Sequence, residues 1–563
     1  MNLELKKVKL LLNKKRITLL IILLQIGVLA PIAVMSISGN FKETNVNLAQ
    51  QDTIENPTSL QDYYQAVTTI DWDFSTYFGG SSEDFINDVE VDSNNNIIIS
   101  GYTSSINLPT ENAYQENSGG SFDAFIAKFD PTGQSLIFAS YLGGNDFDAA
   151  VDVTIDSEDN IYLTGLAYSL NFPTVNALSS SRNGICDAFV TKFNPTGDVI
   201  FSTFLGGSGE DFCYGVAMDS SNNLVITGHT ASSDFPVTSD AYDSSFAGEE
   251  DAVLILLNSD GQSIEYSTYL GGSGVDMGLK GFLNCNDEIV IAGLTSSSDF
   301  VSTDDALQSS FAGDFDAFVT IFNVTGQEVI YSTYYGGNGD EIAQSIGEDS
   351  QGNLIIVGRT TANNLPLSTT PLQNQHGGLE DGYVLKLNHQ DYSLNFSTYL
   401  GGSEYDFAFD FLIDEQDNII IFGTTASEEF EVTSNAYQTT IGGNLDAFLA
   451  ILPPNGGSLV YSTFIGGEGD DKGKFITYDN QKNLIIAGFT GSTDFPAFSS
   501  FQNAKSSATD GFIGKFSFTI QTQKSSFFTI ENLVFYTIIL TLVCYSKRRK
   551  CILSQQRGCL RHK

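Results

Sequence analysis

One short phrase occurs seven times in this chain, and its spacing limits the fold more than any other feature. The phrase joins an aromatic residue, a short run rich in hydroxyl side chains and a pair of glycines, as in FSTYLGG. Its copies begin at Phe74, Phe138, Phe201, Tyr266, Tyr331, Phe396 and Tyr461. Successive starts are 63 to 65 residues apart. A constant period of this kind predicts repeated units that stack into one body, rather than a series of independent domains.

Each repeat has the pattern of four short antiparallel strands. In the first copy, residues 88–91 alternate, 96–100 are mostly apolar, 123–129 alternate again, and 135–144 contain the repeated phrase. Turn-forming residues separate these segments, and a loop of roughly twenty residues joins the second to the third. A four-stranded sheet cannot bury both faces alone, so this pattern predicts propeller blades packed around an axis.

The chain is therefore expected to be all-β, a seven-bladed β-propeller of four-stranded antiparallel blades over residues 72–520. The blades are expected at 81–142, 145–205, 208–270, 273–335, 338–400, 403–465 and 468–518. The last repeat lacks a fourth strand, whereas residues 72–78 read as such a strand with no repeat before them. We expect residues 72–78 to complete the last blade and close the ring; the alternative is a frayed N-terminal strand and an open last blade.

The repeated pattern STYLGG…D…VDSxxNIIITG…DFP…AY…DAFVAKFNPTG resembles the seven-bladed β-propeller repeat family of the SBBP type, over residues 72–520. The resemblance implies the propeller fold and an exported, often surface-attached protein. It implies no shared reaction and no catalytic residues. The long loop carries two regular apolar positions in every copy, exemplified by Leu108 and Tyr114, and we expect both to dock on the blade.

Both ends of the chain have the composition of membrane-targeting segments. A basic stretch precedes the apolar run 17–35, and the apolar run 527–545 precedes the sequence KRRK. These patterns predict a signal peptide or signal anchor (1–38), a linker (39–71), a second linker (521–526), a C-terminal transmembrane helix (527–546) and a basic cytoplasmic tail (547–563). The expected location is the cell membrane, with the propeller extracellular.

The charge of the propeller excludes one class of partner. Residues 70–520 contain 11 Lys and Arg against 62 Asp and Glu, a net charge of −51. Nucleic-acid binding needs a basic surface, so it is not expected. Only three histidines lie in this region, without a repeated partner, and no GxSxG, HExxH or P-loop pattern occurs. Blade 7 is unusual in holding five lysines, which could mark the docking place of a partner.

Carboxylates recur at fixed places in the repeat. Six aspartates stand four residues past a GG pair and are candidate calcium ligands: Asp84, Asp148, Asp211, Asp276, Asp406 and Asp471, with Glu341 in the equivalent place. A second series begins each third strand: Asp123, Asp187, Asp251, Asp316, Asp381, Asp446 and Asp510. Both series are expected on one face of the propeller. Capping of turns by backbone N–H bonds and binding of Ca²⁺ in separate sites both fit such positions. A third series, exemplified by Asp92, fits an Asx turn better than a calcium loop.

These features favour a binding or scaffolding module at the cell surface, for adhesion, surface-layer association, or capture of a ligand or cation. The expected partner is an extracellular glycan or surface protein. The alternative function is an extracellular carbohydrate-active enzyme, a lyase or hydrolase, that uses the acidic face. Cys186 and Cys213 fall near that face, so a disulfide between them is also considered.

Overall fold

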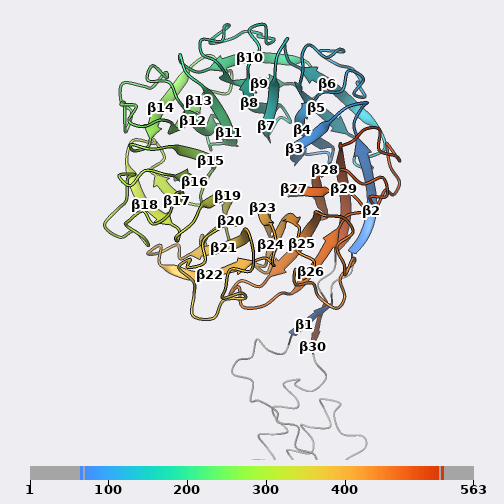
Figure 1. The fold of residues 1–563 in the computed structure, drawn as a ribbon. Coiled ribbons are helices and arrows are strands. Elements are labelled where there is room, and N and C mark those ends of the chain that lie inside the picture. Colours follow the sequence, from blue (N-terminus) through green and yellow to red (C-terminus); the bar gives the residue numbers. More distant parts are fainter. Residues whose placement is uncertain (1–63, 68–69, 519–520, 525–563) are drawn as a thin grey trace, which may run out of the picture. The chain divides into compact units, whose positions relative to one another are not determined.

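The computed structural model describes residues 64–67, 70–518 and 521–524. All of these residues belong to the unit Tyr63–Lys563. The regular secondary structure of these residues consists of β-strands only. The strands form seven four-stranded antiparallel sheets and one two-stranded sheet. The expected all-β, seven-bladed propeller is thereby confirmed, and the seven sheets surround a central axis (Figure 1).

Blade 1 is β3 (Asp84–Val91), β4 (Ile97–Thr103), β5 (Asp123–Phe129) and β6 (Leu136–Leu142). Blade 2 is β7 (Asp148–Ile155), β8 (Ile161–Ala167), β9 (Asp187–Phe193) and β10 (Val199–Leu205). Blade 3 is β11 (Asp211–Met218), β12 (Leu224–Thr230), β13 (Asp251–Leu257) and β14 (Ile264–Leu270). Blade 4 is β15 (Asp276–Leu283), β16 (Ile289–Thr295), β17 (Asp316–Phe322) and β18 (Val329–Tyr335).

Blade 5 is β19 (Glu341–Glu348), β20 (Leu354–Thr360), β21 (Asp381–Leu387) and β22 (Leu394–Leu400). Blade 6 is β23 (Asp406–Ile413), β24 (Ile419–Thr425), β25 (Asp446–Leu452) and β26 (Tyr461–Ile465). Blade 7 is β27 (Asp471–Tyr478), β28 (Leu484–Thr490), β29 (Asp510–Phe518) and, from the start of the propeller, β2 (Ile70–Phe78).

Strand β2 closes the ring by pairing with the far end of the chain. It runs antiparallel to β29, from Ile70 opposite Phe518 to Phe78 opposite Gly511. Its side chains Phe74, Tyr77 and Phe78 are buried. Blade 7 therefore combines strands that are more than four hundred residues apart in sequence.

The first strand of each blade is longer than the sequence pattern suggested. In blade 1 it begins at Asp84 rather than Asp88 and contains a β-bulge between Ile86 and Asp88. A bulge at the same place interrupts the first strand of all seven blades. Because the extra residue breaks the two-residue alternation, the pattern of the early half is hidden in the sequence.

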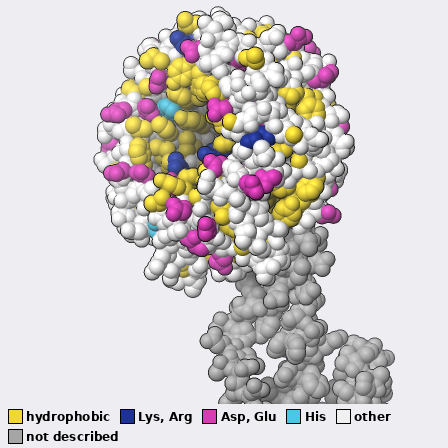
Figure 2. Space-filling model, turned by 45° about the vertical axis from the view of Figure 1, so that its right-hand side comes forward, with side chains coloured by type: hydrophobic (Ala, Val, Ile, Leu, Met, Phe, Trp, Pro, Cys, Tyr) yellow, Lys and Arg dark blue, Asp and Glu magenta, His cyan; other side chains and the backbone are white. Residues whose placement is uncertain are grey.

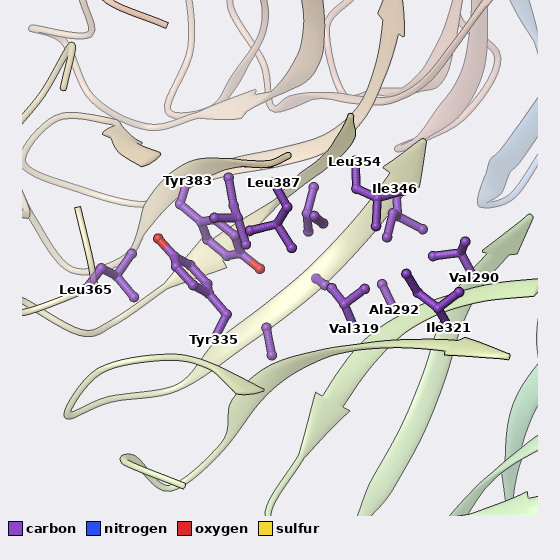
Figure 3. Close-up of a cluster of buried hydrophobic side chains, with 14 of the residues drawn as sticks. Val290, Ala292, Val319, Ile321, Tyr335, Ile346, Leu354, Leu365, Tyr383 and Leu387 are labelled. Carbon is purple, nitrogen blue, oxygen red and sulfur yellow. The ribbon is translucent and has the colours of Figure 1, made fainter. Parts of the chain in front are cut away.

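Apolar faces of neighbouring blades form the core. Between blades 4 and 5, for example, Val290 and Ile321 of blade 4 belong to one buried cluster with Ile346, Leu354 and Leu387 of blade 5. Figure 3 shows these side chains converging from the two sheets. Each interface buries alternate residues of both sheets, which is why a single blade would not be stable alone.

The repeated phrase fastens the long loop to its blade. In blade 1 the hydroxyl of Tyr141 donates to the carbonyl of Ser105 at 2.6 Å and accepts from the amide of Leu108 at 2.7 Å. Of the two expected loop anchors, the first set is buried: Leu108, Phe172, Phe235, Phe300, Leu365, Phe430 and Phe495. The second set is divided: four members are 39–42% exposed (Tyr114, Leu178, Tyr242, Tyr437), whereas three are partly buried and pack against core clusters (Leu307, Leu372, Phe501).

The structure also bears on the expected disulfide, the two expected linkers and the expected membrane segments. Cys186 and Cys213 are both buried and both free, so the disulfide considered for them is not formed. They belong to two different hydrophobic clusters. Strands β1 (Tyr64–Val67) and β30 (Gln521–Lys524) pair antiparallel, so part of each segment expected to be a linker is paired. In the described part of the chain, no helix is long and apolar enough to cross a membrane. The expected segments 1–38 and 527–563 lie outside that part.

Candidate functional site

The six aspartates proposed as calcium ligands, and Glu341, each begin an inner strand and are fully buried. In every blade a carboxylate oxygen accepts a hydrogen bond from the second glycine of the GG pair, four residues earlier, at 2.6–2.8 Å. A serine hydroxyl from the loop after the second strand donates to the same carboxylate in six blades, at 2.6–3.0 Å. In blade 5 that serine is replaced by Ala362. These carboxylates therefore hold turns together.

The aspartates that begin the third strands have the same role in the adjoining loop. Each accepts a hydrogen bond from the backbone N–H four residues earlier, at 2.7–2.9 Å. The two series meet at the GG pairs: a Cβ on Gly79 would lie 2.6 Å from Oδ2 of Asp84 and 2.8 Å from Cγ of Asp510. The first glycine is required because two carboxylates fill the space that a side chain would need.

Burial raises the pKa of the first series. The pKa of Asp84, like those of Asp148, Asp211 and Asp406, rises to about 6 through burial, against the opposing effect of its hydrogen bonds. The pKa values of Asp276 and Asp471 are also raised, again by burial. Among the described residues, no group of three His, Cys, Asp or Glu side chains is placed to hold a metal ion. The aspartates occupy separate turns, and calcium binding in any of them stays a prediction.

The hairpins at the opposite face also use carboxylates as caps. Oδ1 of Asp92 accepts from the amides of Asn94 and Asn96 at 2.9 and 2.8 Å, and Asn95 has a positive φ of 64°. Lys128 of the third strand forms an ion pair with Asp92 at 2.8 Å. The same pair recurs in blades 2, 5 and 7 as Lys192–Asp156, Lys386–Asp349 and Lys515–Asp479. The Asx-turn interpretation is confirmed.

The channel along the axis departs from this repetition. One position of the inner strand, four residues past its initial acid and directly after the bulge, varies from blade to blade. Its residues are Asp88, Asp152, Gly215, Lys280, Ser345, Asp410 and Phe475. Side chains of inner strands line the axis of a propeller. Four of these residues, Asp88, Asp152, Lys280 and Asp410, are here named the polar bar.

The polar bar connects blades across the axis. Asp88, Asp152 and Asp410 each accept a hydrogen bond from an inner-strand amide of the following blade, at 2.8, 2.7 and 3.2 Å. Lys280 of blade 4 reaches Asp152 of blade 2, with Nζ 2.9 Å from Oδ1. Burial lowers the pKa of Lys280, but Asp152, Asp88 and Asp410 outweigh it and raise the pKa overall. Lys280 therefore stays charged and joins blade 4 to blade 2, past blade 3.

Three carboxyls of this region, those of Asp88, Glu90 and Asp410, hold protons more tightly than free carboxyls do. Burial raises the pKa of Asp88 and of Asp410, and Asp152 adds to the rise at Asp88. Burial also raises the pKa of Glu90, two residues beyond Asp88, to about 7. Partial protonation of Glu90 near pH 7 lowers the negative charge in this part of the channel.

Two further sets of inner-strand residues are here named the channel mouth. They lie between the polar bar and the end of the channel at which the inner strands begin. They are one residue past the initial acid (Phe85, Ala149, Phe212, Met277, Ile342, Phe407, Lys472) and three residues past it (Asn87, Val151, Tyr214, Leu279, Gln344, Phe409, Lys474). All but Ala149 are half-buried. Figure 2 shows a hollow in the propeller in which hydrophobic side chains gather, with Lys, Arg, Asp and Glu at its sides.

Aromatic rings and cations alternate at one side of the mouth. Nζ of Lys474 lies 3.6 Å from the ring centre of Phe409, and Nζ of Lys472 lies 5.5 Å from that of Phe489. The guanidinium of Arg359 lies 5.3 Å from the ring centre of Phe407. Burial, and then the charges of Lys472 and Arg359, lower the pKa of Lys474 to about 7.

The opposite side of the mouth brings a histidine, a tyrosine and a carboxylate together. The ring of His229 stacks on Phe212 at 4.7 Å, and its centre is 5.4 Å from that of Tyr214. Nε2 of His229 lies 3.6 Å from Oε2 of Glu250. Burial lowers the pKa of His229 to about 4, so this imidazole is neutral at pH 7.

The comparisons with known proteins reach only distant relatives. No protein-family model matches the chain. An uncharacterized WD repeat-containing protein, L264, of Acanthamoeba polyphaga mimivirus is 28% identical over 171 residues, which is 25% of this chain and 12% of that protein. Regulatory protein FlaEY of Caulobacter vibrioides is 26% identical over 306 residues, 51% of this chain and 31% of that protein. The chain thus spans less than a third of either curated relative.

Two solved structures were also found to be similar, both of proteins of unknown function. The one from Dyadobacter fermentans aligns over 80% of this chain and 99% of its own, with 8% identity and a TM-score of 0.38. The one from Bacteroides caccae aligns over 62% of this chain and 92% of its own, with 8% identity and a TM-score of 0.31. The distant WD-repeat similarity agrees with a repeat protein and does not establish the SBBP family.

Sequence reasoning missed the polar bar and the channel mouth. It searched for residues that recur in each copy, and those proved to be turn caps. The available signal was the reverse: a column of the repeat in which Asp, Gly, Lys, Ser and Phe replace one another while its neighbours stay constant. The five lysines of blade 7 stand out in the sequence, but the approach of Lys474 to Phe409 of blade 6 depends on the packing of blades.

Proposed function

We propose that this chain is a binding or scaffolding module of the SBBP repeat type, displayed at a cell surface, and that it seats its ligand in the channel mouth. One observation carries the proposal: the channel mouth and the polar bar lose the repetition that turns, cores and loop clamps keep. A residue that stabilises a blade is needed in each blade. A ligand without sevenfold symmetry needs different residues from different blades.

The chemistry of the mouth supports binding. Concave sites lined by apolar and aromatic side chains, with a few polar groups, are the usual places where propellers and other folds hold ligands. Here the mouth includes the half-buried rings of Phe85, Phe212 and Phe407, Lys472 adds a charge, and the Lys280–Asp152 ion pair belongs to the polar bar. Such a site gives a ligand apolar contact and a fixed orientation.

Display at the surface is proposed from the sequence of the two ends. The apolar runs 17–35 and 527–545 each adjoin basic residues, a pattern that favours cytoplasmic basic flanks and an external propeller. The pairing of β1 with β30 supports a common tether, because the segments that lead to both runs start from paired strands. Protease added to intact cells should remove the propeller, and full protection of it would contradict export.

A carbohydrate-active enzyme is the second candidate, favoured by one observation. Tyr214, His229 and Glu250 supply the residue types that proton transfer to and from a sugar requires. His229 is, however, sandwiched against Phe212, which limits its access to a substrate. Incubation with polysaccharides should release no shorter products if the protein only binds.

A glycan array and isolated cell envelopes, probed with the purified chain, test the proposed function. Met277→Trp fills the mouth and should abolish binding, whereas Ile330→Trp, at a 38% exposed residue of the outer strand β18, is the matched control. Equal binding by both variants, at unchanged melting temperature, would move the site away from the mouth.

A further inference from the structure

The cations of this acidic propeller fall into two kinds. Lys128, Lys192, Lys386 and Lys515 each form an ion pair with a hairpin aspartate, and Lys280 forms one with Asp152. Among the described residues 70–518, five cations have no carboxylate within ion-pair distance: Arg182, Lys472, Lys474, Lys482 and Lys505. Lys472 and Lys474 differ from the other three by their place. Both are in the channel mouth and half-buried.

Aromatic rings, rather than carboxylates, lie against Lys472 and Lys474. Lys474 lies over Phe409 of blade 6, Lys472 over Phe489 of its own blade, and Arg359 of blade 5 over Phe407. A ring attracts a cation through its quadrupole and leaves the net charge in place. Of the three, only Arg359 has a carboxylate partner, Glu380 at 2.7 Å. Blades 5 and 7 thus bring three basic side chains to one side of the mouth, and two of them, Lys472 and Lys474, have no carboxylate partner among the described residues.

The same side of the mouth offers stacking surfaces and a hydrogen-bonding amide. From Phe489 the rings continue to Phe85 at 5.0 Å and on to Tyr102 at 4.8 Å. All three rings are half-buried, so each leaves part of its surface to a ligand. Gln344 stands between Ile342 and the polar bar and can bond to hydroxyls.

We propose that the mouth between blades 5, 6, 7 and 1 binds an acidic sugar residue of a glycan, with its carboxylate at Lys472, Lys474 and Arg359 and its ring against the aromatic side chains. The inference rests on the proposed binding function and specifies its ligand. A carboxylate balances the unpaired charges, the apolar face of a sugar ring packs on an aromatic ring, and hydroxyl groups pair with the amide. A neutral sugar would leave the lysines unpaired.

The titration of Lys474 gives the inference a second readout. The charged groups that face Lys474 are Lys472 on its own strand and Arg359 from blade 5, and Arg359 is paired with Glu380. Asp410 of blade 6 follows Phe409 in sequence, but its carboxylate accepts hydrogen bonds from Ser345 and Ile476. A bound carboxylate opposes the burial and repulsion that lower the pKa of Lys474, so the ligand should bring a proton with it near pH 7.5.

Calorimetry on the full-length chain tests the inference. The probes are a trimer of galacturonic acid, the neutral galactose trimer and benzoate, each measured at pH 7.5 in two buffers of different ionisation heat. We expect the acidic trimer to bind at least about 10-fold more tightly than the neutral one, with net proton uptake. In Lys472→Gln/Lys474→Gln the preference and the proton uptake should both vanish.

Lys482→Gln is the matched control, because Lys482 belongs to the same blade, also lies over a ring (Tyr478, at 4.9 Å) and is in the opposite-face hairpin. It should bind like the unaltered protein. Equal binding of acidic and neutral trimers would overturn the acid preference and leave the binding function intact. Benzoate as tight as the trimer would overturn the saccharide. No heat with any probe would overturn the inference, while the array result decides the proposed function separately.

Discussion

Removal of strand β2 should cost the propeller most of its stability. The perturbation compares two truncations, one lacking residues 1–69 and one lacking 1–78. Both lose the N-terminal apolar run and β1, so they differ only in the strand that pairs with β29. The shorter truncation keeps the ring closed, and the longer one opens it.

The magnitude follows from what β2 buries. Phe74, Tyr77 and Phe78 are 2%, 1% and 0% exposed. Burying a large apolar side chain stabilises by about 1.5–3 kcal/mol, so three contribute roughly 5–9 kcal/mol. The ladder with β29 adds about 0.5–1.5 kcal/mol for each net hydrogen bond. The loss is comparable with the entire free energy of unfolding of a typical domain, about 5–15 kcal/mol.

Thermal unfolding followed by circular dichroism measures the difference. We expect the 1–69 truncation to melt in one transition and the 1–78 truncation to melt far lower or without a sharp transition. A synthetic peptide of residues 70–80 should restore the transition in the second protein, and a scrambled peptide should not. Equal melting temperatures for the two truncations would refute the conclusion that the clasp holds the ring closed.

Further predictions concern the buried carboxylates and their turns. Burial raises the pKa of Asp84, Asp148, Asp211 and Asp406 from 3.8 to about 6, so the folded state binds protons more tightly than the unfolded state. The contribution of each protonated carboxyl to the free energy of unfolding is therefore largest below about pH 4 and is lost as pH rises to about 6, by up to about 3 kcal/mol. Asp211→Asn should reduce the slope of the melting temperature against pH. Gly79→Ala should lower the melting temperature strongly, since the added Cβ would lie 2.6 Å from Asp84 and 2.8 Å from Asp510, whereas Gly457→Ala, with only one atom at 3.9 Å, is a control. Calcium binding at the six aspartates predicts a larger rise in melting temperature with Ca²⁺ than with Mg²⁺ at constant ionic strength; equal shifts would indicate charge screening, and no shift would leave these residues as turn caps.

The fold was predictable because the repeated phrase and its strand pattern recur along the chain. Spacing of the repeated phrase fixed the number of blades, and alternation located the second, third and fourth strands within a few residues. The first strand was harder, since the bulge after Ile86 shifts its alternation by one residue. The alternation therefore reveals only residues 88–91, whereas the strand begins at Asp84.

The candidate site was less predictable than the fold for a physical reason. Asp84 and its equivalents drew attention because they recur, and recurrence follows from a requirement of every blade: the amide of the GG turn needs an acceptor. The approach of Lys474 to Phe409, or of Lys280 to Asp152, joins different blades. Those contacts depend on the angle between sheets, which the pattern of one repeat does not contain.

The charge of the molecule explains why the asymmetric positions matter most. A net charge of −51 over residues 70–520 repels anions at long range, so a basic site on the outer surface would be weak. At physiological ionic strength that repulsion is screened beyond about 8 Å, whereas charges within a channel are screened much less. Lys472 and Lys474 therefore act on a ligand in the mouth more strongly than the distant acids do. The polar bar limits the remaining repulsion from below, because Lys280 balances one of its three aspartates and burial favours protonation of Asp88 and Asp410. A site for an acidic ligand is thus compatible with an acidic propeller, provided that the site lies in the channel mouth.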